Sequence, residues 1–154
     1  MPILKYTTSI DASKTVMEIQ IALAKAGAKS VNIDYDSGGQ PESVSFLISV
    51  QGKWVNFRLP SSYTGVLKML ENDPSVPKKL KTIDQARRVA WRITKDWTLA
   101  QMAIIEARQA ELAEVFMPYA ITASGQTLFQ AFREGQLSLG SGVENGDDLG
   151  RGVI

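Results

Sequence analysis

The first 27 residues change from a strand-like to a helix-like hydrophobic pattern. Apolar residues and Thr alternate with polar residues over 4–10, which predicts a strand with one buried face. Apolar positions then recur at helical spacing behind a Thr15-x-x-Glu18 capping box, and Gly27 supplies the left-handed residue that commonly ends a helix. The pattern therefore predicts a helix at about 13–26.

Three further stretches alternate with a period of two residues. The alternation at 31–35 and 44–50 flanks a segment rich in Asp, Gly and Pro, which is typical of a hairpin. A third strand is predicted at about 54–59, because a glycine turn precedes it and Pro60 cannot donate to a ladder.

A short helix is predicted after this strand. Ser61 or Ser62 can cap it, and it runs to about residue 72. Residues 1–72 therefore have the order β-α-β-β-β-α, which predicts an antiparallel sheet of about four strands with helices on one face. The fold class is α+β.

The second half of the chain is predicted to be helical. A capping box at Thr82–Gln85 opens the longest periodic segment, whose apolar and small residues fall at three- and four-residue steps: Ile83, Ala86, Ala90, Ile93, Trp97, Ala100, Ile104 and Ala107. The helix is expected to run for more than ~30 residues towards Pro118, on the order of 50 Å. A helix of that length must project or contact another chain. A short closing helix is predicted around 128–132.

The chain of 154 residues has the length of one domain. We expect a single α+β domain at 1–134, in which 1–72 hold the sheet with two helices and 78–134 form the helical part. Residues 135–154 are rich in glycine and contain no aromatic residue, so we expect a flexible tail.

Composition excludes several kinds of active site. The chain has no His and no Cys, so a Ser-His-Asp triad, a thiolate nucleophile and the common zinc sites are excluded. Asp34 and Asp36 share a strand face and offer oxygen ligands to a hard cation, although Asp in this position more often caps a hairpin turn. We expect a non-catalytic protein with no cofactor and no metal site.

The start of the chain lacks the apolar core and cleavage site of a secretory signal. No segment approaches the roughly 20 apolar residues that a bilayer span requires. We therefore expect an intracellular protein that has no membrane partner.

The most informative charge pattern lies at 78–95, where seven Lys and Arg residues accompany one carboxylate, Asp84. Helical spacing places several of these cations on the same helix face as the indole of Trp91. A cationic face with an exposed aromatic ring suits a phosphate-bearing ligand. The candidate ligand-binding residues are Arg87, Arg88, Trp91, Arg92 and Lys95. The alternative is a solvated charged face with Trp91 packed on the sheet. The formal net charge of +1 also argues against strong general DNA binding.

Arg58 is a second candidate for anion binding. It shares a strand face with Trp54 and Asn56, because the side-chain period of a strand is two residues. If this face is open, it forms a sheet-based binding platform. Otherwise these side chains merely cover the exposed side of an antiparallel sheet.

Small residues along 86–110 favour close helix–helix approach. We expect a homo-oligomer, most simply a two-fold dimer, in which this stripe is buried between subunits. The alternative, at even weight, is that the stripe covers the chain's own sheet.

Several short motifs resemble a known group of proteins: Val89–Trp97, Met117-Pro118-Tyr119, Gly125-Gln126-Thr127, Thr7-Thr8 and Phe57–Pro60. Over residues 1 to about 135 the chain resembles a family of small uncharacterised proteins of tailed bacteriophages and prophages, whereas the glycine-rich end departs from it. The resemblance implies no activity, cofactor or catalytic residue. It implies a setting in the bacterial cytoplasm, among small DNA-handling proteins and proteins that counter host defence.

The leading hypothesis is a non-catalytic protein that binds single-stranded nucleic acid or a nucleotide. The alternative is a protein-interaction module that binds and inhibits a host factor, including an oligomer that sequesters a nucleotide signal. An enzyme would require Asp34, Asp36 or Glu18 to converge with a Lys or a metal ion.

Overall fold

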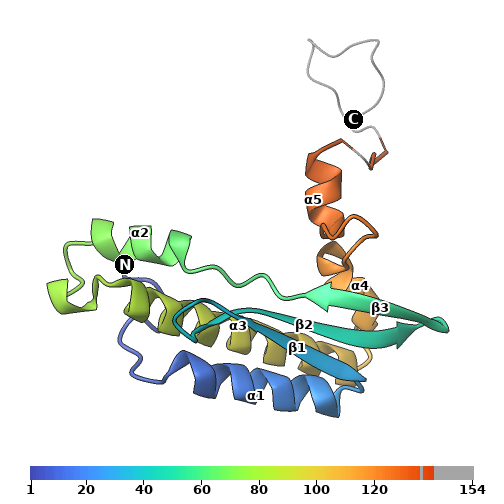
Figure 1. The fold of residues 1–154 in the computed structure, drawn as a ribbon, viewed down its shortest axis with the longest axis horizontal. Coiled ribbons are helices and arrows are strands. Elements are labelled where there is room, and N and C mark those ends of the chain that lie inside the picture. Colours follow the sequence, from blue (N-terminus) through green and yellow to red (C-terminus); the bar gives the residue numbers. More distant parts are fainter. Residues whose placement is uncertain (136, 141–154) are drawn as a thin grey trace, which may run out of the picture.

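A three-stranded antiparallel sheet with two long helices on one face forms the centre of the fold. The computed structural model describes residues 1–135 and 137–140. The strand order is β1-β2-β3, and α1 and α3 run side by side in the same direction (Figure 1). The elements are α1 (Ala12–Lys25), β1 (Ser30–Tyr35), β2 (Pro41–Val50), β3 (Lys53–Arg58), α2 (Thr64–Asn72), α3 (Ile83–Glu106), α4 (Leu112–Phe116) and α5 (Leu128–Arg133), with 3₁₀ turns at Lys78–Leu80 and Met117–Tyr119.

The α+β class, the hairpin, the third strand and the closing helix are confirmed. The helix predicted at 61–72 is also present, although it begins at Thr64 and neither serine caps it. The tail predicted at 135–154 lies mostly outside the described residues.

The strand predicted at 4–10 is wrong. Residues 4–7 form turns, and Leu4 points outward with 73% of its surface exposed. The segment crosses α3, where the side-chain amide of Gln85 donates to the carbonyl oxygens of Tyr6 and Thr8 at 2.8 and 2.9 Å. A side chain thus satisfies backbone groups that a ladder would otherwise pair.

A short segment near the C-terminus occupies the free edge of β3. The backbone N–H of Ile121 donates to the carbonyl of Asn56 at 2.7 Å, and Ala120 lies opposite Phe57 as an isolated antiparallel bridge. This contact covers part of the edge and brings the loop at 122–126 beside the sheet.

The main core lies between the sheet and the pair α1 and α3. Phe46 and Phe57 stack with ring centroids 5.3 Å apart, and Phe116 meets Phe46 edge-on at 5.5 Å. Ile19 and Leu23 of α1 are buried against these rings. Phe116 therefore anchors α4 to the sheet.

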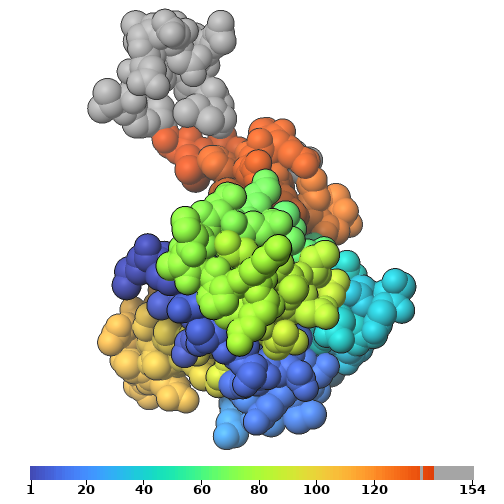
Figure 2. Space-filling view, turned by 90° about the vertical axis from the view of Figure 1, so that its left-hand side faces the viewer, coloured from blue at the N-terminus to red at the C-terminus, as the bar shows by residue number. Residues whose placement is uncertain are grey.

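A second cluster joins α2 to the first half of α3. Its buried members are Val66, Leu70, Val76, Ala86, Val89 and Ala90. In Figure 2, α2 (green) covers this end of the molecule, with α1 (blue) below and the β1–β2 hairpin (cyan) to one side. The predicted small-residue stripe is thus partly internal, because Ala86 and Ala90 pack against the chain's own α2.

The predicted bounds of α1 hold, but its capping box does not. Asp11 is the N-cap residue, and Thr15 is buried one turn inside the helix, where its Oγ1 donates to the Asp11 carbonyl at 3.4 Å. Gly27 adopts φ +101° after the helix, as predicted. Thr15 does not cap the helix because α1 begins at Ala12, which places Thr15 one turn inside it.

Helix α3 is shorter than predicted. It spans 24 residues, or roughly 36 Å at 1.5 Å per residue. It ends at Glu106, and Arg108 takes the left-handed conformation at φ +57°. The side chain of Thr82 accepts the Gln85 N–H at 3.1 Å as expected, whereas the Gln85 side chain turns to the N-terminal segment.

The buried face of α3 is also rotated from the predicted stripe. Ile83 is 47% exposed and Ala100 faces solvent. The buried residues instead include Val89, Trp91, Thr94, Thr98 and Met102.

Candidate ligand-binding surfaces

Trp91 lies in the main core. Only 3% of its surface is exposed, and its indole N–H donates to the Pro41 carbonyl at 3.3 Å. A stacking role requires a solvent-facing ring, so the structure excludes that role for Trp91. The indole serves instead to pack α3 against the start of β2.

Arg92 and Lys95 are engaged by α1. Arg92 Nη1 and Lys95 Nζ lie 3.1 and 2.6 Å from the same carboxylate oxygen, Glu18 Oε2, and Arg92 also donates to Thr15 Oγ1 at 3.3 Å. The hydrogen bond from Lys95, together with the charges of both cations, lowers the pKa of Glu18, although desolvation acts in the opposite direction. These two cations join the helices and are not free for an outside ligand.

Arg87 and Arg88 also have partners within the chain. Arg87 pairs with Asp36 at 2.8 Å and with Asp84 at 3.5 Å, and Arg88 Nε donates to Gln85 Oε1 at 3.0 Å. Of the five residues proposed from the 78–95 charge pattern, Arg87, Trp91, Arg92 and Lys95 contact other elements and Arg88 bonds within α3, so they do not form one open binding face.

Asp36 closes the β1–β2 turn, and Asp34 has partners of its own. Asp36 Oδ1 accepts the backbone N–H groups of Gln40 and Gly38, both at 2.9 Å. The Gln40 N–H, more than the Gly38 N–H or the Arg87 charge, lowers the pKa of Asp36 against an opposing desolvation effect. Asp34 accepts from Asn32 and Ser43. The hairpin-cap interpretation of Asp36 is confirmed. In the described part of the chain no cluster of three or more metal-ligating side chains occurs.

A polar cavity of about 320 Å³ lies beside the Arg87–Asp36 pair. Its walls come from the hairpin turn, the segment before α2 and α3, and they include Glu42, Ser61, Ser62 and Tyr63. The Arg87 guanidinium lies 5.0 Å from the centre of the Tyr63 ring. Two carboxylates, of Asp36 and Glu42, face one arginine here, so the cavity does not favour a phosphate.

The outer face of the sheet, on the side away from α1 and α3, presents a different surface. Its side chains are Ser30, Asn32 and Asp34 of β1, Ser43, Ser45, Leu47 and Ser49 of β2, and Trp54, Asn56 and Arg58 of β3. We call these ten residues the open sheet face. The register places Asn32, Ser45 and Arg58 in one row across the three strands. The next row contains Ser30, Leu47 and Asn56.

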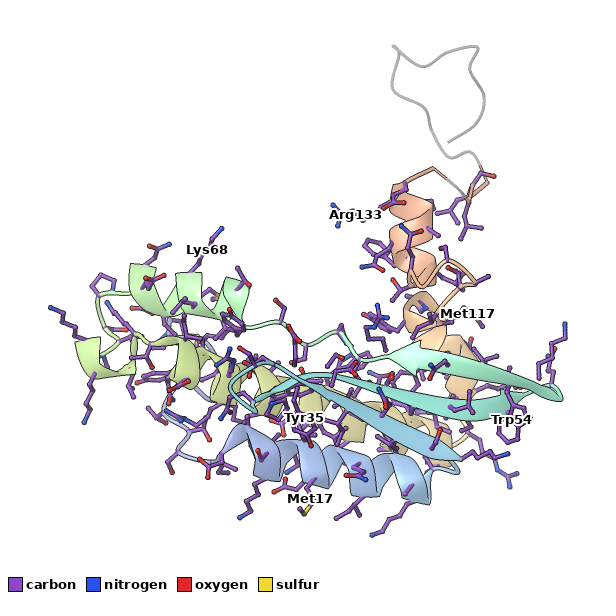
Figure 3. The ribbon with its side chains drawn as sticks, viewed as in Figure 1. Met17, Tyr35, Trp54, Lys68, Met117 and Arg133 are labelled. Carbon is purple, nitrogen blue, oxygen red and sulfur yellow. The ribbon has the colours of Figure 1, made fainter. Side chains whose placement is uncertain are left out.

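Trp54 is the aromatic side chain of the open sheet face. It is 55% exposed and stands near the β2–β3 turn (Figure 3). Lys29, which precedes β1, reaches across the sheet so that its ammonium lies 4.6 Å from the centre of the indole. At the other end of the face, Arg58 Nη2 donates to the Gly125 carbonyl at 3.4 Å, a long contact that involves one of the five guanidinium N–H donors.

The shared face of Trp54, Asn56 and Arg58 is therefore confirmed, and these side chains are at least partly exposed. Sequence reasoning did not connect Lys29 or Asn32 with them. No local signal places these residues beside β3, because their position depends on the pairing of β1 with β2.

A mainly apolar groove of about 620 Å³ runs between α1 and α3. We call it the α1–α3 groove. Six of its lining residues are apolar (Ile21, Ala22, Ala26, Leu99, Met102 and Ile105) and four are charged (Glu18, Lys25, Lys95 and Glu106). Ile21 is 50% exposed. The available sequence signal was Ile21 itself, which lies outside the apolar stripe that α1 buries.

No helix among residues 1–135 and 137–140 combines the length and the apolarity needed to cross a bilayer. Comparisons with protein-family models, with curated proteins and with solved structures find no match for this chain. The case for a function therefore depends on the residues of this chain alone.

Proposed function

We propose that this chain is a non-catalytic binding protein that holds single-stranded nucleic acid on the open sheet face. The observation that carries the proposal is an exposed indole, Trp54, on the same face as Arg58, with the Lys29 ammonium beside it. This placement moves the expected phosphate-binding function from α3 to the sheet.

Trp54 supplies the surface on which a base can stack. A base and an indole both present π faces, and such stacking contributes about 1–3 kcal/mol per base in single-strand binders. Lys29 has a flexible four-carbon stem, so its ammonium can leave the ring for a neighbouring phosphate when a base takes the ring face.

Arg58 and Lys29 supply the positive charge. The carboxylate of the same face, Asp34, already accepts hydrogen bonds from Asn32 and Ser43 at 3.2 and 2.8 Å. Trp54 and Arg58 are four residues apart on one strand, which corresponds to roughly 13 Å. A short strand of nucleic acid can thus place one base on the indole and a phosphate on the guanidinium.

Polar groups between these two ends suit base edges. Asn32 and Asn56 are exposed, and their amides offer both donors and acceptors. Three of the four β2 residues on this face are serines, whose small side chains leave room beside Leu47 for an extended ligand.

Binding should be weak and dependent on salt. Two phosphate contacts on a single strand predict a slope of log K against log salt of about −1.4. Fluorescence anisotropy with labelled ten-nucleotide DNA and RNA, measured from about 50 to 200 mM salt, tests this expectation.

Two substitutions test the site directly. Trp54→Ala should weaken binding by about 5- to 150-fold, the equivalent of one stacked base. Arg58→Gln should weaken binding and reduce the salt slope by about 0.7. Phe129→Ala and Arg133→Gln on α5 are matched controls, because Phe129 is also half exposed and Arg133 carries the same charge.

The controls should bind as the unmodified protein does. Equal affinity of the unmodified protein and the Trp54→Ala, Arg58→Gln double variant would refute the proposal, as would the absence of binding at low salt.

A further inference from the structure

We propose that the polar cavity beside the Arg87–Asp36 pair binds a small hydroxylated primary amine, with the Glu42 carboxylate as the counter-charge of the ammonium group. The lining of this cavity shares no residue with the open sheet face, so the inference does not depend on nucleic-acid binding. The charges, the hydroxyl groups and the size of the cavity select this class of ligand.

The charges around the cavity are unbalanced. Among its described lining residues, Asp36 and Glu42 carry negative charge and Arg87 alone carries positive charge. The Arg87 guanidinium already has two carboxylate partners, Asp36 at 2.8 Å and Asp84 at 3.5 Å. Glu42 makes no ion pair in the described part of the chain. A ligand with one ammonium group therefore balances the charge of Glu42, whereas an anionic ligand faces two carboxylates.

A β-bulge places Glu42 at the cavity. Asp34 lies opposite Ser43 and Tyr35 lies opposite Pro41, so Glu42 is an extra residue of β2 that has no partner on β1. A bulge interrupts the regular alternation of side chains and redirects the residue that it contains. Glu42 is exposed, so a ligand that enters the cavity can reach its carboxylate.

Hydroxyl groups form much of the remaining polar lining. Ser37 comes from the β1–β2 turn, and Ser61, Ser62 and Tyr63 come from the segment before α2. Within the described residues, the side-chain hydrogen bonds at the cavity leave these four hydroxyl groups without a partner. A hydroxyl group both donates and accepts, so this lining suits a ligand that carries hydroxyl groups of its own.

The walls of the cavity are held in place by contacts between distant segments. The β1–β2 turn lies over α3, where Asp36 bonds to Arg87 (Figure 1). The indole of Trp91 is 3% exposed and bonds to the Pro41 carbonyl, and the Arg87 guanidinium lies 5.0 Å from the centre of the Tyr63 ring. These contacts favour a site that is formed before the ligand arrives, as is usual for small-molecule sites.

The size of the cavity limits the ligand. Its volume of about 320 Å³ corresponds to roughly ten water molecules at about 30 Å³ each. It therefore has room for a molecule of roughly ten to twelve non-hydrogen atoms. A hexosamine is a primary amine of this size, and its hydroxyl groups can meet those of the lining.

Three sugars of nearly equal size test the role of charge. Glucosamine carries an ammonium group at about pH 6, glucose is neutral, and glucuronate carries a carboxylate. Each is titrated to about 20 mM into the isotope-labelled full chain, with the backbone N–H signals of Ser37, Glu42 and Ser61 followed by NMR. Glucosamine should shift these signals with a Kd of about 1 mM, as expected for a ligand of roughly twelve non-hydrogen atoms. Glucose should bind at least about tenfold more weakly, and glucuronate should not bind.

Two substitutions test the residues. Glu42→Gln should weaken glucosamine binding at least about tenfold, because it removes a charged hydrogen-bond acceptor. Tyr63→Phe keeps the ring beside Arg87 but removes the hydroxyl group, and should weaken binding about 2- to 10-fold. Glu71→Gln on α2 and Tyr119→Phe make the same changes outside the cavity, so both controls should bind glucosamine as the unmodified protein does.

Glucosamine that causes no shift of these signals at the highest concentration would overturn the proposal. Equal affinities for glucosamine and glucose, or equal affinities of Glu42→Gln and Glu71→Gln for glucosamine, would overturn it as well. Glu42→Gln should retain nucleic-acid binding and Trp54→Ala should retain glucosamine binding, so the two proposals can fail separately.

Discussion

Replacing Gln85 with Leu is predicted to destabilise the fold by about 2–4 kcal/mol. The residue is 2% exposed, and its amide donates to the carbonyls of Tyr6 and Thr8 while its oxygen accepts from Arg88. Leu has a similar volume, so the expected cost comes from lost hydrogen bonds and not from a cavity. Each bond contributes about 0.5–1.5 kcal/mol, and a carbonyl left buried without a partner costs more.

Urea unfolding followed by circular dichroism measures this cost. With a denaturant slope of about 1–3 kcal/mol per M, the midpoint should fall by about 1 M or more at an unchanged slope. Gln20→Leu is the matched control, because it makes the same substitution at an exposed position of α1. It should alter the free energy of unfolding by less than about 0.5 kcal/mol.

A second variant separates the lost donors from the lost side chain. Gln85→Glu keeps an acceptor for Arg88 but places a carboxylate against the carbonyls of Tyr6 and Thr8. These oxygens raise the pKa of the introduced carboxyl in the folded state, so the variant should be least stable at neutral pH and recover as the pH falls. A Gln85→Leu cost below about 0.5 kcal/mol, or a Gln85→Glu variant with no such recovery, would refute the role assigned to Gln85.

Two other perturbations address the hairpin and the core. Asp36→Asn removes the ion pair with Arg87 but keeps a turn-capping side chain. Because the pKa of Asp36 is lowered in the folded state, the loss of stability in this variant should be complete above about pH 4 and should disappear as the pH falls through the folded pKa. Urea melts of both proteins from pH 7 to pH 3 measure this difference. A constant difference across that range would contradict this assignment. Phe116→Ala should lower the free energy of unfolding by about 3–5 kcal/mol, because it leaves a cavity between Phe46 and Trp97. Phe129→Ala is the control and should change it little, because Phe129 is half exposed. Equal melting temperatures for the two variants would contradict the role of Phe116 as an anchor.

The error at 4–10 shows what alternation cannot decide. A period of two residues is compatible with a strand, but a strand also requires a partner with free backbone groups. Here Gln85, 77 and 79 residues away, satisfies the carbonyls of Thr8 and Tyr6. The backbone N–H of Ile121 bonds to the free edge of β3 instead, although the segment around Ile121 shows no strand pattern.

The candidate site on α3 failed for a related reason. The spacing of Arg87, Trp91 and Lys95 correctly describes one helical face, yet it does not reveal which neighbour that face meets. Arg87 finds Asp36 at a separation of 51 residues, and Arg92 finds Glu18 at a separation of 74. These clustered cations therefore form ion pairs with carboxylates that are distant in sequence.

The sequence by itself determined the elements and their faces, because helix and strand periodicity is set by backbone geometry within a few residues. It was sufficient to predict the hairpin, the third strand, α1, α5 and the common face of Trp54 and Arg58. Only the tertiary structure decided which faces are covered, because the groups that cover them are distant in sequence. That choice buried Trp91 and left Trp54 exposed.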